Sequence, residues 1–211
     1  MRVVAGTAKG RKLKSPASSG TRPVMDRVKT ALFDILAYRI RDTRFLDLFG
    51  GTGSIGIEAL SRGAAEATFI ELDGPAIRCI RENLAITGLG DRSLVLRTDA
   101  FAFLKQAHVD GRRFDIVYLA PPQYQGLAAR ALAELDAAPP LPEGGLVIAQ
   151  IHPRERSDLD GLRLQRLQRT DERRYGSTLL VFYELVEETA ASEAATESSQ
   201  VVAGQADQKP R

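Results

Sequence analysis

The sequence predicts an α/β domain built on a mostly parallel, seven-stranded sheet with helices on both faces. From residue 45 to residue 151, short apolar runs typical of buried strands alternate with apolar stretches of helical spacing. Four glycines closely follow the first apolar run, as at a sharp turn from a strand into a helix. Two further strand-like segments end the pattern with no helical stretch between them, which predicts an antiparallel C-terminal hairpin.

The elements follow in order from the N-terminus. Residues 2–5 and 11–14 are strand-like and predict a small basic β-hairpin, residues 16–20 have the composition of a linker, and a helix should begin around Pro23. The strands are then expected at 45–49, 67–71, 94–96, 114–119, 145–151, 162–167 and 178–185. Helices are expected up to residue 62, over 76–84, from about residue 100 and over 128–135.

We therefore expect a hairpin and linker over residues 1–20, one domain over 21–185, and a disordered acidic tail over 186–211. No apolar run is long enough to span a membrane, and no signal-like start is present. The single cysteine, Cys79, allows no internal disulfide and favours a reducing, cytoplasmic setting. His108 and His152 are too scattered to indicate a metal site, so we expect no metal. We also expect the protein to be a monomer.

The net charge of +2 is unevenly distributed. Residues 1–44 contain eleven Lys or Arg and three Asp, a net charge of +8, whereas residues 186–211 carry a net charge of −3. A basic N-terminal region predicts a polyanionic partner, although a well-solvated basic surface is the alternative. The candidate RNA-binding residues are Arg2, Lys9, Arg11, Lys12, Lys14, Arg22 and Arg27, whose contacts would be to phosphates.

The glycine loop predicts a site for a nucleotide-like ligand. Gly51, Gly53 and Gly56 match the dinucleotide pattern Gly-x-Gly-x-x-Gly, with Glu71 near the place of a ribose-binding acid. Asp47, however, precedes the glycines and would repel a pyrophosphate. It suits a cationic ligand, and S-adenosylmethionine carries an ammonium and a sulfonium but no phosphate. We therefore favour S-adenosylmethionine, with a nicotinamide cofactor as the alternative.

Three acids fall at the ends of three successive predicted strands. Asp47 ends the first, Glu71 could accept hydrogen bonds from both ribose hydroxyls, and Asp99 could accept one from the adenine amino group. Each acid taken alone could equally be a helix cap, the role we expect for Asp73. The candidate cofactor-binding residues are Asp47, Phe49, Gly50, Gly51, Gly53, Glu71, Asp99 and Ala100.

A rigid loop follows the fourth predicted strand. Its residues, the candidate catalytic set, are Ala120, Pro121, Pro122, Gln123 and Tyr124. The prolines stiffen a run of carbonyl acceptors, which suits an exocyclic amine that must lose its conjugation before it attacks a methyl group. An aromatic side chain beside them can stack on an extruded base. A merely rigid loop is the alternative.

With these motifs the chain resembles the RsmD-type 16S ribosomal RNA guanine-N2 methyltransferases over about residues 1–185. The resemblance rests on Arg11-Lys12-Leu13, Thr21-Arg22-Pro23, Asp26-Arg27-Val28, Ala31-Leu32-Phe33, Asp47-Leu48-Phe49 with the glycine loop, Glu58-Ala59-Leu60-Ser61-Arg62-Gly63-Ala64, Glu82-Asn83-Leu84, Asp99-Ala100 and Arg174-Tyr175-Gly176. It implies a Rossmann-like class I S-adenosylmethionine-dependent methyltransferase. The implied reaction is methylation of the exocyclic N2 of one guanine in 16S ribosomal RNA, within a partly assembled small subunit.

One departure concerns the catalytic loop. The family pattern is Asp or Asn, two prolines and an aromatic residue, whereas this chain has Ala120 in the first place and Gln123 in the aromatic place, with Tyr124 one residue later. Loss of a transition-state hydrogen bond of this kind reduces a rate by roughly 10²–10³. One alternative is therefore a donor-binding RNA-associated protein with weakened or lost transfer activity. Another is an amine methyltransferase that acts on DNA or protein, since a basic N-terminal region does not distinguish one nucleic acid from another.

Overall fold

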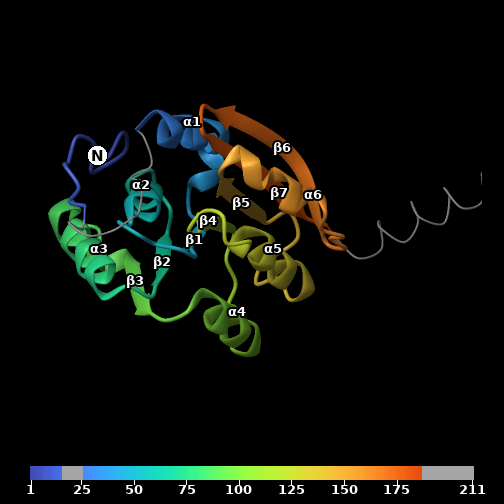
Figure 1. Ribbon diagram of the computed structural model, residues 1–211. Coiled ribbons are helices and arrows are strands. Elements are labelled where there is room, and N and C mark those ends of the chain that lie inside the picture. The colour runs from blue at the N-terminus through green and yellow to red at the C-terminus, as the bar shows by residue number, and fades with distance from the viewer. Residues whose placement is uncertain (16–25, 187–211) are drawn as a thin grey trace, which may run out of the picture.

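The computed structural model describes residues 1–15 and 26–186, and shows a seven-stranded sheet in the order β3-β2-β1-β4-β5-β7-β6 (Figure 1). The strands are β1 (Arg44–Asp47), β2 (Glu66–Glu71), β3 (Ser93–Arg97), β4 (Ile116–Leu119), β5 (Leu146–Ile151), β6 (Leu167–Tyr175) and β7 (Thr178–Leu185). β1 to β5 pair in parallel, and β7 is antiparallel to both β5 and β6. The predicted fold class is confirmed.

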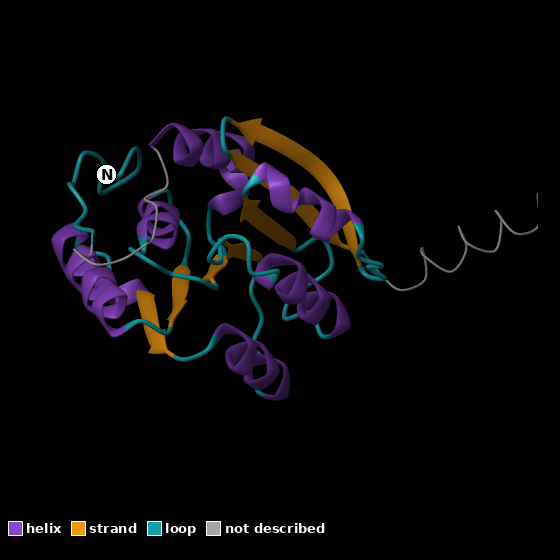
Figure 2. Ribbon diagram, viewed as in Figure 1, coloured by secondary structure: helices purple, strands orange, loops and turns teal. Residues whose placement is uncertain are grey.

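Helices cover both faces of the sheet (Figure 2). One face packs against α1 (Asp26–Leu36), α2 (Ser54–Ser61) and α3 (Gly74–Thr87), and the other against α4 (Ala100–Val109), α5 (Leu127–Ala137) and α6 (Arg156–Asp160). The short 3₁₀ turns are η1 (Ala37–Ile40), η2 (Gly90–Arg92) and η3 (Pro153–Glu155). Successive strand residues point to opposite faces, so Phe45 joins the first core and Leu46 the second. Both faces are buried, which explains the continuous apolar runs.

The strand order places a topological switch point beside β1. β1 pairs with β2 on one side and β4 on the other, and the next strand along the chain, β3, lies outside β2. The connections therefore leave β1 and β4 in opposite directions, which opens a crevice above their carboxyl ends. Ligands of open α/β sheets bind in such a crevice.

The C-terminal region differs from the prediction between β5 and β7. The expected strand at residues 162–167 is wrong, because Leu162 and Leu164 lie in a loop and pack partly buried against the core. The polar stretch that follows is the strand: β6 pairs with β7 from Leu167 to Tyr175. β6 is an edge strand of the sheet, and all its residues but Leu167 are exposed or half-buried, so it needs no apolar run. The helical turns η3 and α6 were not predicted either.

The N-terminal hairpin is held against α2 and α3. Its strands form one antiparallel bridge, Arg2 with Lys12, rather than an extended ladder. Val3 and Leu13 are buried in the same core as α1 and α2. The backbone N–H groups of Val4 and Ala5 donate to the buried carboxylate of Glu58 at 2.8 and 2.9 Å. The hairpin is therefore fixed to the domain by core packing and by a buried charge.

Some predictions fall outside the described residues. These are the linker at 16–20, Arg22, the helix start near Pro23, and residues 187–211 of the predicted tail. Among the residues that are described, no helix is long and apolar enough to cross a membrane.

Candidate active site

A cavity of about 870 Å³ lies at the carboxyl ends of β1, β2 and β4, within the size range of small-molecule sites. It brings together all thirteen residues predicted to bind the cofactor or to form the catalytic loop. Its walls include Asp47, Phe49, Gly50, Gly51, Glu71, Asp99, Ala100, Ala120, Pro121, Pro122, Gln123 and Tyr124. Gly53 lies in the same turn, between the lining residues Thr52 and Ser54.

Two positions of the glycine loop, Gly53 and Gly56, require glycine for different reasons. Gly53 begins α2 with a φ of +76°, a left-handed conformation that glycine adopts without strain. Gly56 lies in the first turn of α2, and a Cβ there would come within 2.3 Å of the Phe69 ring. Gly56 therefore lets α2 pack closely on β2, and is needed for packing rather than for ligand approach.

Asp47 is the most perturbed acid of the cavity. Its side chain is almost fully buried, and Oδ2 accepts a hydrogen bond from the Gly56 N–H at 3.2 Å. The pKa of Asp47 is raised to about 8, mainly by burial; the hydrogen bond from Gly56 opposes this change, and the nearby Glu71 adds a smaller increase. At neutral pH the carboxyl is thus largely protonated. A cation placed beside it would favour the ionised form.

Glu71 is engaged with the protein backbone. Oε2 accepts from Gly51 N at 2.7 Å, and Oε1 accepts from Leu72 N and Asp73 N at 2.8 and 2.9 Å. Glu71 therefore shapes the glycine loop. Oε2 retains acceptor capacity toward the cavity, since a carboxylate oxygen can accept two hydrogen bonds.

Asp99 caps α4, and one wall of the cavity beside it is aromatic. Asp99 Oδ1 accepts from Phe101 N and Ala102 N, both at 3.0 Å, and Oδ2 has no partner among the described residues. Phe49 and Phe101 meet edge to face, with ring centroids 6.4 Å apart. This wall offers an apolar surface beside a carboxylate oxygen. Asp73 caps α3 through Ala76 N at 3.0 Å, which confirms that prediction.

The catalytic loop forms the opposite wall. Ala120 is half-buried and contributes no polar side-chain atom, and Pro122 and Gln123 are exposed. Tyr124 adopts a left-handed backbone, with a φ of +62°, and is 61% exposed. The tyrosine ring therefore stands at the mouth of the cavity rather than in the core.

Sequence reasoning missed two pairs of residues: Tyr118 and Gln150 line the cavity, whereas His152 and Glu155 contact Tyr124 without lining it. The Tyr118 hydroxyl donates to Gln150 Oε1 at 2.6 Å, and burial together with Asp47 raises the pKa of Tyr118 well above its usual value. His152 lies with its ring 5.4 Å from the Tyr124 ring, and Glu155 accepts from Tyr124 N at 2.8 Å. Gln150 could have been found from its place near the end of a strand, as the acids were, whereas Glu155 follows no such pattern.

The basic hairpin is connected to the glycine loop through one buried side chain. Asn83 of α3 donates from Nδ2 to Thr52 O at 2.9 Å and to Lys14 O at 3.1 Å, and its Oδ1 accepts from Lys14 N at 2.7 Å. Arg2 pairs with Asp26 and Lys14 with Glu82. The remaining described candidates are exposed and form no ion pair with any described residue: Lys9, Arg11, Lys12 and Arg27.

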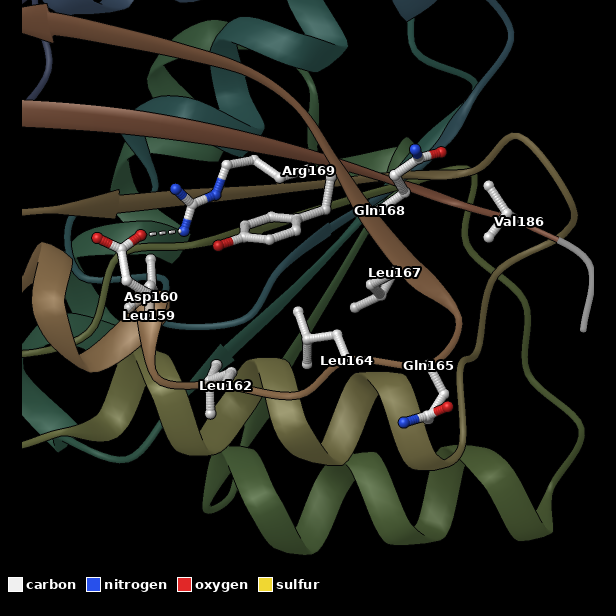
Figure 3. A pocket seen from close by; sticks show the side chains of 10 residues that line it. Leu159, Asp160, Leu162, Leu164, Gln165, Leu167, Gln168, Arg169 and Val186 are labelled. Atoms are coloured by element: carbon white, nitrogen blue, oxygen red, sulfur yellow. Dashed lines mark hydrogen bonds and ion pairs between the residues drawn. The ribbon is translucent and has the colours of Figure 1, made fainter. Parts of the chain in front are cut away.

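A second cavity, of about 640 Å³, lies away from this site along β6 and α6 (Figure 3). Leucines line much of it, and Arg169 reaches across to Asp160 at 2.7 Å. None of the predicted site residues borders it. The cavity at the switch point is therefore the candidate active site.

Several known proteins are similar to this chain in sequence and in fold. The family described as conserved hypothetical protein 95 matches residues 1–184. Ribosomal RNA small subunit methyltransferase D of Escherichia coli K12 is 40% identical over 136 residues, which cover 64% of this chain and 67% of the relative. The protein of the same name from Haemophilus influenzae is 40% identical over 136 residues, covering 64% and 70%.

Two solved structures agree over most of the chain. A hypothetical protein of Thermus thermophilus is 37% identical, with a TM-score of 0.72, and the match covers 88% of this chain and 99% of that one. The Escherichia coli protein yhhF, described as a proposed methyltransferase, is 32% identical, with a TM-score of 0.75 and coverages of 88% and 98%. The chain therefore belongs to the conserved hypothetical protein 95 family, the RsmD family that its motifs resemble.

Proposed function

We propose that this protein is an S-adenosylmethionine-dependent methyltransferase that modifies the exocyclic N2 of a guanine in 16S ribosomal RNA. It acts as a monomer on the partly assembled small subunit. One observation carries the proposal: a single cavity joins three strand-end acids to a Pro-Pro loop followed by an exposed tyrosine. The relatives named small subunit methyltransferase D support the RNA substrate.

The residues of the cavity fit the methyl donor. Burial raises the pKa of Asp47, and the ammonium of the donor would supply a counter-charge for its ionised form. Glu71 Oε2 and Asp99 Oδ2 are acceptors suited to a ribose hydroxyl and an adenine amino group. Phe49 and Phe101 offer an apolar wall for the adenine ring. A nicotinamide dinucleotide fits less well, since its pyrophosphate offers no positive charge to Asp47 and would lie near the Glu71 carboxylate.

The bound donor supplies an electrophilic methyl group on a sulfonium. The chain supplies position, exclusion of water and hydrogen-bond acceptors. The carbonyls of Ala120 and Pro121 accept from the guanine amine, which draws its lone pair out of conjugation and toward the methyl group. Tyr124 stacks on the extruded base. The basic hairpin binds phosphates and sets affinity, not the choice of base.

A transfer assay tests this proposal. Small subunits from a strain that lacks this methylation are incubated with labelled S-adenosylmethionine and the protein, and the modified nucleotide is mapped by mass spectrometry. We expect one labelled N2-methylguanine in 16S RNA, and about tenfold to a hundredfold less label with Asp47→Asn at a limiting donor concentration. Label in DNA, in protein or in a small molecule but not in the RNA would contradict the proposal.

A second candidate is a donor-binding RNA protein without transfer activity, and the side chain of Ala120 is the observation that favours it. Calorimetry and the transfer assay separate the two. Tight binding of donor and subunit with no turnover supports the second candidate, whereas turnover that Tyr124→Ala lowers strongly supports the first.

A further inference from the structure

One buried carboxylate connects the catalytic loop to the end of β5. Glu155, in η3, is 6% exposed. Its Oε1 accepts from the backbone N–H of Tyr124 at 2.8 Å, and its Oε2 accepts from the backbone N–H of His152 at 3.0 Å. Tyr124 and His152 are far apart in sequence, so a single side chain connects the catalytic loop at the cavity to the segment that follows β5.

The conformation of Tyr124 requires such a support. A non-glycine residue with a φ of +62° is strained by about 1–3 kcal/mol, and persists only where its surroundings hold it. Tyr124 has no compensating burial, since it is 61% exposed. The hydrogen bond to Glu155 is thus the contact that holds this backbone. A strained, exposed tyrosine contributes little to the stability of the fold, which points to a role in ligand binding.

His152 is placed by the same carboxylate and stands beside the tyrosine. The two ring centroids are 5.4 Å apart and the ring planes are inclined by 49°. His152 Nδ1 accepts from Arg154 N at 3.1 Å, so the Nε2 edge of the imidazole remains available. Histidine and tyrosine are both side chains on which unstacked RNA bases stack. Because the two ring planes are inclined by 49°, one of the rings can stack on the face of a base while the other contacts the edge of that base.

We propose that Glu155 is a positioning residue, which holds Tyr124 and His152 as a two-ring receptor for the extruded base. The inference deepens the proposed function and rests on it. Glu155 acts only through the backbone of the two aromatic residues and does not contact the base. Its removal should therefore impair the base-binding step and leave donor binding intact.

A double-mutant cycle in the full-length protein tests this role. Glu155→Ala, Tyr124→Ala and the double variant are assayed on undermethylated subunits, with Glu143→Ala, an exposed acid, as the control. We expect Glu155→Ala to lower kcat/KM at least tenfold with the donor Kd unchanged within twofold. We also expect the loss in the double variant to be clearly smaller than the product of the two single losses, because Glu155 acts partly through Tyr124. Independent, multiplicative losses would overturn the inference, because they would show that Glu155 acts elsewhere.

A second measurement does not depend on methyl transfer. Amide hydrogen exchange at Tyr124 and His152 should be at least tenfold faster in Glu155→Ala than in the wild type. If Glu155→Ala does not fold, Glu155→Gln replaces it, since its amide can accept from only one of the two N–H groups and should give a smaller change. Unchanged exchange overturns the positioning role. An inactive wild type with accelerated exchange in the variant overturns the proposed function but not the positioning.

Discussion

The Lys29 ammonium lies 3.1 Å from the Glu58 carboxylate, and both side chains are fully buried. Glu58 also accepts hydrogen bonds from the hairpin backbone and from Arg62 Nε at 3.0 Å. Lys29 in turn donates to the hairpin at Arg2 O. One buried ion pair thus joins α1, α2 and the hairpin.

We expect Glu58→Ala to lower the free energy of unfolding by about 3–5 kcal/mol, because it leaves a buried ammonium without its counter-charge. Lys29→Met should cost less, since Glu58 keeps Arg62 and two backbone donors. Urea denaturation measures both variants. Exposed Glu66→Ala is the control and should change stability by less than about 0.5 kcal/mol. Equal losses for Glu58→Ala and Lys29→Met would contradict this ranking.

Asp47 should make donor binding dependent on pH. Its pKa of about 8 means that, below this pH, binding of a cationic donor must release a proton. Affinity should therefore rise with pH up to about 8 and then level off. Calorimetry at pH 7 in two buffers of different ionisation enthalpy measures the proton release. Asp47→Asn should abolish that release and weaken binding about tenfold to a hundredfold, as expected for loss of a charge-assisted contact. A release that persists in Asp47→Asn would assign the proton to another group.

The same carboxyl should reduce stability at high pH. The pKa of Asp47 is raised from 3.8 to about 8 on folding. The folded protein therefore binds more protons than the unfolded chain between these values, and stability falls as pH rises through this window. Asp47→Asn keeps an acceptor for Gly56 N but carries no charge. We expect a higher Tm than the wild type at pH 8.5 and a similar Tm at pH 4, measured by calorimetry without donor.

Ala120 should limit the rate of transfer. Ala120→Asn introduces a side-chain acceptor at the wall of the cavity, and we expect kcat to rise by up to about 10² while the donor Kd stays constant. Ala120→Val adds bulk without an acceptor and should not raise kcat. Single-turnover assays on subunits compare the three proteins. No gain with Asn would indicate that the carbonyls of this loop, or Gln123, already supply the necessary acceptors.

The sequence predicts this site well where strand ends define it. Asp47, Glu71 and Asp99 each follow an apolar run, and parallel strands bring their carboxyl ends to one edge, so periodicity alone places these acids together. β6 could not be predicted, since an exposed edge strand needs no apolar pattern and its pairing with β7 is a tertiary contact. Glu155 escaped detection because the capping box that it forms has His152 at the N-cap in place of the usual Ser, Thr, Asp or Asn. Its bond to Tyr124 N is a tertiary contact.

The exposed hairpin should contribute salt-dependent RNA affinity without affecting the donor. Lys9, Arg11 and Lys12 are exposed and form no ion pair with a described residue, so replacing all three with Ala should remove their interactions with phosphates. The slope of log K against log salt should become shallower by about 0.7–0.9 for each phosphate that is no longer neutralised. Filter binding to small subunits at several salt concentrations measures the slope, and calorimetry should show an unchanged donor Kd. Lys105→Ala, an exposed change on α4 across the sheet from the hairpin, is the matched control. An equal effect of Lys105→Ala would show that the RNA responds to net charge and not to the hairpin.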